Sequence, residues 1–188
     1  MPSPLAHGAL ALLALPALSD RQPRSAARRG AVVVVLVTFL CLPDVDILAG
    51  WIATGEPFRY HGGASHSLLL APLAGVLFAL VIGRLCSSGW ARRWVVGTCL
   101  YGSHVLMDAL TPGGGVAMWW RLSSARIVSA WTPFYGVRHS QWQEWQLHLM
   151  TLANEGAFAA MVIGAWLAIT AGKNRSRSDG VFEAEAQQ

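Results

Sequence analysis

Acidic and imidazole side chains stand inside stretches of this sequence that are otherwise apolar. Asp44 and Asp46 lie in LPDVDIL, His104 and Asp108 lie in YGSHVLMDALTP, and Glu155 lies in LANEGAF. A charged or imidazole group within a membrane-spanning helix is costly to insert, so such a group marks a functional position by default. The chemistry that these residue types share is the binding of a divalent metal ion.

His104 and Asp108 have the spacing that places two side chains on the same face of a helix. Two such groups can bind one metal ion or two adjacent ions. The alternative is a buried hydrogen bond between the imidazole and the carboxylate, which would only hold helices together. The spacing by itself leaves both interpretations open.

Asp44 and Asp46 follow Pro43, which interrupts a helix. We expect both carboxylates to be presented around an unwound turn. Carboxylates this close together suit a divalent cation, because without one their like charges would favour a neutral acid. The alternative is a polar kink in the helix.

His61 and His66 flank a turn of small residues in the motif HGGASHS. Glycine allows the backbone to approach a bound ion closely, and Ser65 is a candidate cap for a helix that begins near His66. For two histidines in a loop, solvent exposure is the alternative to metal binding.

The candidate ligands lie at similar distances from clusters of basic residues. Asp44 and Asp108 each lie 15 residues after such a cluster, whereas His66 and Glu155 each lie 18 residues before one. At a rise of 1.5 Å per helical residue, these separations are roughly 22–27 Å. His7 lies 14 residues before the first cluster. Alternating helices therefore bring all five groups into one layer near one membrane face.

Four apolar stretches are long enough to cross a hydrocarbon core about 30 Å thick as helices. They are Ala31–Ala53, Ser67–Gly83, Trp94–Leu110 and Leu147–Ala171, in a chain that is 54% hydrophobic and 13% charged. A fifth stretch, Leu5–Leu18, is too short for a full span. We therefore predict an all-α, polytopic membrane helix bundle of four transmembrane helices plus a short N-terminal helix. Residues 1–172 form the predicted membrane-embedded domain, and the polar residues 173–188 are predicted to be a disordered cytoplasmic tail.

The positions of the basic residues predict how the bundle is oriented. Ten of them precede the first full span, separate the second from the third, or follow the last: Arg21, Arg24, Arg28, Arg29, Arg84, Arg92, Arg93, Lys173, Arg175 and Arg177. Such residues favour the cytoplasmic side, so we expect the candidate site near the extracytoplasmic face of a bacterial inner membrane. The net charge of +4 is explained by this bias, and we predict no nucleic acid partner.

The ordered set His7, PDVD (43–46), HGGASHS (61–67) and GSHVLMDALTPGG (102–114) resembles the YdjM-type family of LexA-regulated, membrane-bound metal-dependent hydrolases. The resemblance covers about residues 1–120, and it depends on the order and spacing of the motifs. It implies metal or catalytic roles for seven residues, namely His7, Asp44, Asp46, His61, His66, His104 and Asp108.

Two positions depart from the pattern of this family. Gly62 stands where the family usually has Arg, and Ser65 stands where it has Thr. Ser65 retains a hydroxyl group, but the loss of the Arg removes a guanidinium that could hold a phosphate. Either another arginine on the same side holds the phosphate, or the substrate differs from that of the family. The arginines available on that side are Arg59, Arg121 and Arg126.

These features together predict a membrane-bound hydrolase that uses one or two Zn²⁺ or Mn²⁺ ions. The metal would lower the pKa of a bound water and polarise a carbonyl or phosphoryl oxygen, while Glu155 or one of Asp44 and Asp46 takes the proton. The expected partners are the lipid bilayer and an amphiphilic ester or lipid-linked phosphoester substrate. The oligomeric state is left open.

Two other classes of function use the same residues. A metal transporter or sensor would bind the ion without hydrolysis, and a structural membrane protein would bind no ion. A transporter needs polar groups along the whole path, whereas the cytoplasmic halves of the predicted spans have almost none. This asymmetry favours a one-sided site.

Overall fold

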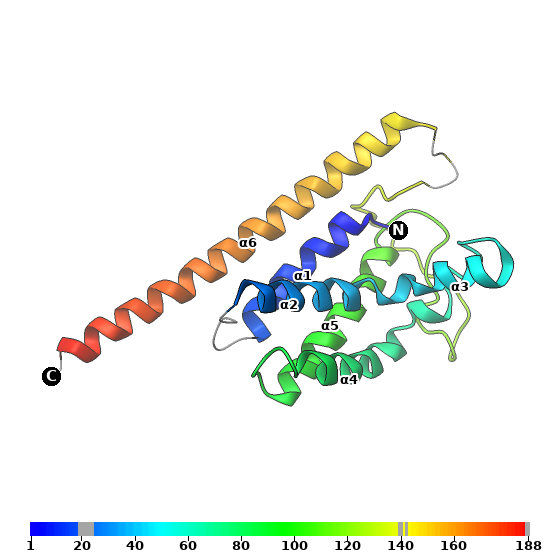
Figure 1. Cartoon of the computed structure of the whole chain (residues 1–188). Helices are drawn as coiled ribbons and strands as arrows, with labels where there is room; N and C mark the ends of the chain where they lie inside the picture. The colour runs from blue at the N-terminus through cyan, green and yellow to red at the C-terminus, as the bar shows by residue number, and fades with distance from the viewer. Residues whose placement is uncertain (19–24, 139–140, 142, 187–188) are drawn as a thin grey trace.

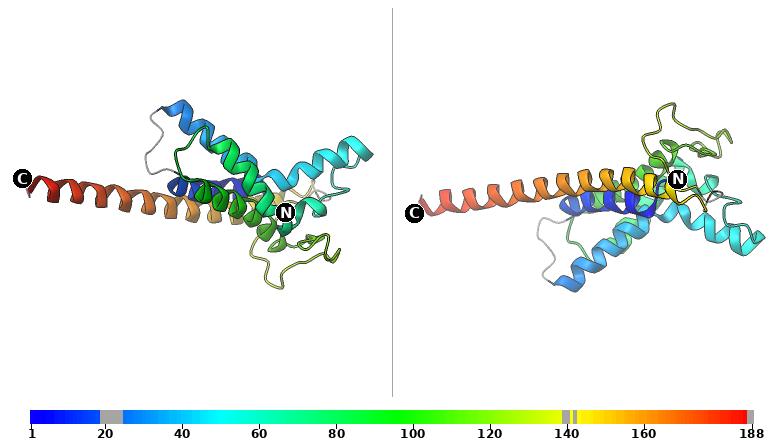
Figure 2. Two further views of the ribbon diagram at one scale, coloured as in Figure 1. Left: turned by 90° about the horizontal axis from the view of Figure 1, so that it is seen from below. Right: turned by 90° about the horizontal axis from the view of Figure 1, so that it is seen from above.

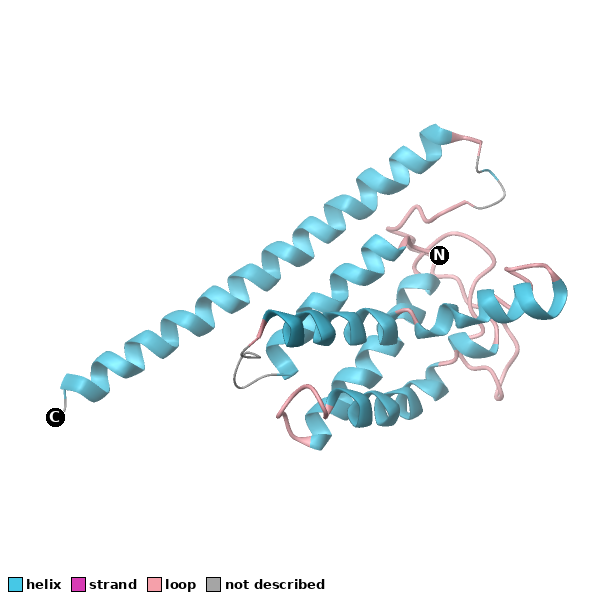
Figure 3. Ribbon diagram, viewed as in Figure 1, coloured by secondary structure: helices cyan, strands magenta, loops and turns pink. Residues whose placement is uncertain are grey.

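The apolar stretches form helices close to their predicted positions in the computed structural model, which describes residues 1–18, 25–138, 141 and 143–186, with side chains up to residue 172. Six α-helices and three short 3₁₀ helices make up the regular structure of this part of the chain (Figure 3). The α-helices are α1 (Pro4–Leu18), α2 (Ala26–Leu40), α3 (Val45–Thr54), α4 (Ala71–Ile82), α5 (Trp90–Ala109) and α6 (Trp145–Ala186). The 3₁₀ helices are η1 (Leu42–Asp44), η2 (Ala64–His66) and η3 (Leu68–Leu70). The predicted all-α class is confirmed.

The first predicted span is two helices joined by a bend. α2 and α3 meet at an angle of 59°, and the 3₁₀ turn η1 fills the break between them. Pro43 lies in this turn, and it has no N–H to donate to a continuous helix. The predicted interruption at Pro43 is confirmed, and it places Asp44 and Asp46 at the start of α3.

Close packing between α4 and α5 builds the centre of the bundle. A Cβ atom on Gly75 would lie 2.7 Å from the backbone oxygen of Trp94, and one on Gly97 would lie 2.5 Å from the Cβ of Phe78. Only glycine allows the two helices to approach this closely. Because α5 carries both His104 and Asp108, this packing fixes where those side chains lie.

α1 lies between α6 on one side and α2 and α5 on the other (Figure 1). Its buried residues Ala11 and Leu18 pack with Leu36 of α2 and Leu100 of α5 in the main apolar core. The N-terminal end of α1 lies near the long irregular segment that follows α5 (Figure 1). This arrangement brings His7 to the same end of the bundle as the end of α5.

The outer faces of the helices are apolar. Ile52, Leu73 and Met161 are each about two-thirds exposed or more. Among the described residues, one helix is long and apolar enough to cross a membrane, Trp145–Gly172, and a second qualifies if the bent pair α2 and α3 counts as one span. α4 has only 12 residues, so helix length alone does not establish the predicted four spans.

α6 is a single helix of 42 residues that extends well beyond the other helices (Figure 2). It continues through residues 173–186, for which the sequence predicted disorder. Ala, Glu, Lys and Arg in this segment are good helix formers, so the backbone can remain helical after the apolar stretch ends. Arg21 and Arg24, used above to predict orientation, lie outside the described residues.

The long segment between α5 and α6 is irregular but tied to the bundle. Val116 and Ile127 exchange two backbone hydrogen bonds as an isolated antiparallel bridge. The N–H of Ala117 donates to the oxygen of Gly62, and the N–H of Leu68 donates to that of Met118. The segment therefore packs directly against the loop that carries His61 and His66.

Candidate metal centre

All seven residues that were predicted as metal ligands meet at one end of the bundle. They come from α1 (His7), the bend between α2 and α3 (Asp44 and Asp46), the loop before α4 (His61 and His66) and the last turns of α5 (His104 and Asp108). Helix rise accounts for this convergence, because Asp44, His66 and Asp108 each lie 15 or 18 residues from a basic cluster at the far end of the same stretch.

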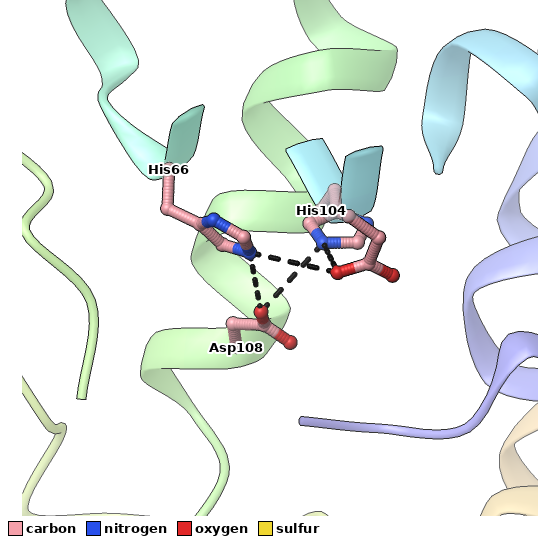
Figure 4. Close-up of side chains that lie close together, drawn as sticks. His66, His104 and Asp108 are labelled. Atoms are coloured by element: carbon pink, nitrogen blue, oxygen red, sulfur yellow. Dashed lines mark ion pairs between the residues drawn. The ribbon is translucent and has the colours of Figure 1, made fainter. Parts of the chain in front are cut away.

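Four donor atoms form a group with the spacing of a metal coordination shell. Nε2 of His66 lies 3.0 Å from Oδ2 of Asp108 and 3.7 Å from Oδ1 of Asp44. Nε2 of His104 lies 3.6 Å and 3.3 Å from the same two oxygens. In tetrahedral Zn²⁺ sites with bonds of about 2.0–2.1 Å, ligand atoms lie roughly 3.3–3.4 Å apart. His66 and His104 both point toward Asp108, as Figure 4 shows.

Asp46 contacts the other nitrogen of two imidazoles. Its Oδ1 lies 3.1 Å from Nδ1 of His61, and its Oδ2 lies 3.2 Å from Nδ1 of His66. The hydroxyl of Ser65 also donates to Oδ2 at 2.6 Å. A carboxylate that accepts from Nδ1 fixes the tautomer of a histidine and leaves Nε2 as the metal-ligating nitrogen. The Nε2 atoms of His61 and His66 face Asp108, at 4.0 Å and 3.0 Å from its Oδ2.

His7 approaches the group from the side of α1. Its ring stacks on the ring of His104 with the centroids 4.0 Å apart, and its Nε2 lies 3.5 Å from Oδ1 of Asp108. The side chain is 1% exposed. The prediction that the short N-terminal helix brings His7 to the site is therefore confirmed as a matter of position.

The buried polar atoms of this centre fit a bound cation. The Nε2 atoms of His7, His66 and His104 and both carboxylate oxygens of Asp108 are buried, and they lie at ion-pair distances from one another without forming a hydrogen bond of regular geometry. Buried donors and acceptors normally have partners, and a divalent ion would satisfy several of these at once. Imidazole nitrogens and carboxylate oxygens together favour Zn²⁺ or Mn²⁺ over an ion that prefers oxygen alone.

His66 carries a positive charge in the metal-free protein. Burial opposes the charged form, but the surrounding carboxylates Asp108, Asp44 and Asp46 outweigh it and raise the pKa of His66 to about 10. Three carboxylates that hold a proton on an imidazole would attract a divalent cation for the same electrostatic reason.

A second group of potential ligands lies beside the first. Asp46, His61 and His66 offer atoms within 4.8 Å of one another, and His66 belongs to both groups. Asp46 can serve either as a ligand of a second ion or as the hydrogen-bond partner that orients both histidines. The described residues therefore accommodate one ion, with a second site adjoining it.

Glu155 lies apart from both groups. Its side chain is fully buried, and its Oε2 accepts a hydrogen bond of 2.6 Å from the N–H of Ser3, immediately before α1 begins. A carboxylate at this position stabilises a helix N-terminus, so Glu155 anchors the helix that carries His7. Its other oxygen, Oε1, is buried without a hydrogen-bond partner among the described residues.

The variant Glu155→Gln separates anchoring from catalysis. An amide oxygen can still accept the Ser3 N–H, but an amide cannot take a proton at neutral pH. We expect the variant to keep its metal content and to hydrolyse substrate within about twofold of the unmodified rate, because Glu155 contacts the start of α1 and none of the candidate ligands. Metal analysis and initial rates on the same purified samples check this, and a rate about 10²-fold lower at full metal content would instead identify Glu155 as a proton acceptor.

Three residues of the site were missed or misassigned from the sequence. Ser65 does not cap a helix, because Ser67 accepts the N–H of Leu69 at the start of η3 while Ser65 binds Asp46. Tyr101 lies one helical turn before His104 on α5, and its hydroxyl donates to the backbone oxygen of Ser65. That spacing on α5 is the signal that could have identified Tyr101.

Comparison with known proteins places the chain in a family. Residues 1–176 match the family described as YdjM inner membrane protein. A similar protein is the inner membrane protein YbcI of Escherichia coli (strain K12), which is 36% identical over 93 residues, or 48% of this chain. The match spans about half, 53%, of the length of that relative. No solved structure matches the chain. The chain thus belongs to the YdjM family of inner membrane proteins.

Proposed function

We propose that this protein is a metal-dependent hydrolase of the bacterial inner membrane that cleaves an ester or phosphoester bond in an amphiphilic substrate. The observation that carries the proposal is the group of four donor atoms from Asp44, His66, His104 and Asp108, with nitrogen–oxygen distances of 3.0–3.7 Å. A divalent ion held by these atoms would lower the pKa of water and polarise the oxygen of the bond to be cleaved.

Individual residues have distinct roles in the proposed reaction. His66, His104, Asp44 and Asp108 hold the ion, with His7 and His61 close enough to join them. Asp46 orients two imidazoles and is the proton acceptor in the proposed reaction. His7, His66 and His104 are buried, and the low dielectric around them strengthens each electrostatic contact.

The proposed membrane arrangement has four spans and a short N-terminal helix, with the C-terminus in the cytoplasm and the metal centre near the extracytoplasmic face. An apolar hollow supports access from the bilayer. Asp44 lines this hollow together with Ile47, Leu48, Trp51 and Pro57. A ligand with an apolar tail can therefore lie against α3 while its polar end reaches the metal centre.

Metal removal tests the proposal. We expect purified protein in detergent to bind at least one Zn²⁺ or Mn²⁺ per chain and to hydrolyse phosphoester or carboxylic ester probes. A chelator should reduce the rate to that of the uncatalysed reaction, and added metal should restore it. Bound metal without any chelator-sensitive hydrolysis would instead favour a sensor or transporter, and the absence of bound metal would favour a structural protein.

A further inference from the structure

A cavity of about 210 Å³ opens beside the metal centre, on the side of the segment between α5 and α6. His61 and Asp108 of the centre line it, together with Phe58, the glycine-rich turn at Gly113 and Gly114, and Arg126. Of the three arginines considered from the sequence, Arg126 is the one that lines this cavity. Arg121 instead stacks over the ring of Trp120.

The guanidinium of Arg126 is held in place by two backbone oxygens. Nη1 donates to the oxygen of Gly115 at 3.2 Å, and Nη2 donates to the oxygen of His61 at 3.1 Å. Ile127, the next residue, forms the antiparallel bridge to Val116. A guanidinium has five N–H donors, so three remain for a ligand after these two contacts.

Because Gly62 has no side chain, the guanidinium of Arg126 can occupy the space beside it. A Cβ atom on residue 62 would lie 3.1 Å from Nη1 of Arg126 and 2.7 Å from the oxygen of Gly115. Gly62 also has a φ of +72°, a backbone angle that residues other than glycine rarely adopt. Arg126 therefore reaches the edge of the centre from the opposite segment, at the place where residue 62 has no side chain.

With one divalent ion bound, the charges at the centre favour a fixed cation beside an anionic ligand. Asp44, Asp46 and Asp108 carry three negative charges, and one divalent ion leaves a net charge of −1 if the imidazoles are neutral. This net negative charge would repel a phosphate group. Arg126 brings the net charge to zero and presents N–H groups in the fork geometry that matches phosphate oxygens.

We propose that Arg126 is the anion-binding residue of this protein and that the substrate is a phosphate ester. This inference rests on the proposed hydrolase function. The non-bridging oxygens of the phosphate accept hydrogen bonds from Arg126, and the phosphorus faces His61 and Asp108. Water adds to phosphorus, the P–O bond to the leaving alcohol breaks with its electron pair on oxygen, and the proton released from water ends on that oxygen.

Binding of inorganic phosphate to the metal-loaded protein tests the inference without turnover. We expect Arg126→Ala to keep its metal content and to raise the Kd for phosphate about 10- to 100-fold, as for the loss of a charge-assisted contact. Arg126→Lys should retain part of the affinity. Arg59→Ala removes one positive charge from the same loop region without lining the cavity, and it should stay within about twofold of the unmodified protein.

The choice of substrate separates anion binding from a structural role of Arg126. A soluble phosphomonoester and phospholipid vesicles should both be compared with a neutral carboxylic ester. The inference predicts that kcat/KM falls for phosphate esters but not for the carboxylic ester in Arg126→Ala. Hydrolysis of vesicles would identify a lipid headgroup as the source of the phosphate, and hydrolysis of the soluble ester alone would identify a free phosphate ester.

Two results would overturn the inference while leaving the proposed function intact. One is an unchanged phosphate Kd in Arg126→Ala at full metal content. The other is an equal loss of activity on charged and neutral esters in both Arg126 variants, since that shows a structural effect. Failure of the unmodified protein to bind metal, or to show chelator-sensitive hydrolysis, would instead contradict the proposed function itself.

Discussion

Asp108→Ala is expected to remove the metal from the centre and to abolish hydrolysis. Oδ2 of Asp108 lies 3.0 Å from Nε2 of His66 and 3.6 Å from that of His104, and its Oδ1 faces Nε2 of His7. No other carboxylate in the described part of the chain contacts all three imidazoles. Loss of an orienting neighbour costs roughly 10–100-fold in metal affinity, and loss of a ligand should cost more.

Elemental analysis of purified variants measures this effect directly. Glu56→Ala removes an exposed acid near the same face and should leave metal content unchanged. Asp108→Asn preserves the shape of the side chain but not its charge, so it should also lose metal if the carboxylate is a ligand. Equal metal content in Asp108→Ala and the unmodified protein, with both folded, would show that the residue only hydrogen-bonds to its neighbours.

That these residues meet was predictable because helices advance by a constant rise per residue. Counting from basic clusters placed Asp44, His66 and Asp108 in one layer, and the structure brings these residues within contact distance. The same count gave His7 a place in the site, although its helix is too short for a full span. Pro43 was equally informative, because a proline has no N–H to donate and therefore interrupts a helix at its position.

The roles of individual groups were not predictable in this way. Asp44 and Asp46 are two residues apart in the sequence, yet Asp44 faces Nε2 of His66 and His104, whereas Asp46 contacts only Nδ1 atoms, those of His61 and His66. That difference depends on how the chain turns at η1, which spacing does not encode. Arg126 was one of three arginines available on the same side, and only the hydrogen bonds of an irregular segment select it.

Glu155 shows why depth alone does not assign a residue to a site. The number of residues between Glu155 and Lys173 predicted the same depth as for the ligands. Groups at one depth can nevertheless lie on opposite sides of the bundle. α6 packs against α1, so Glu155 meets the start of α1 rather than the imidazoles. Which helices are neighbours depends on side-chain packing, and glycines such as Gly75 and Gly97 decide it between α4 and α5.

Metal affinity is expected to rise steeply with pH, while the stability of the metal-free protein falls. In the absence of metal, the pKa of His66 is raised from 6.5 to about 10, because three carboxylates outweigh the effect of burial. Metal binding must displace this proton, so affinity should rise about tenfold per pH unit below pH 10. The stabilisation from protonated His66 is complete below pH 6.5 and is lost as the pH rises toward 10.

Unfolding measured in detergent between pH 6.5 and 10, with and without chelator, tests both halves of this prediction. With chelator, the free energy of unfolding should fall by several kcal/mol across the range, and with saturating metal it should not. His66→Gln should flatten the slope in chelator, whereas His148→Gln, outside both ligand groups, should preserve it. A metal-free protein whose stability is independent of pH would show that the three carboxylates do not hold a proton on His66. These carboxylates would then also attract a divalent cation only weakly, because the same negative charges that raise the pKa of His66 are expected to attract the metal ion.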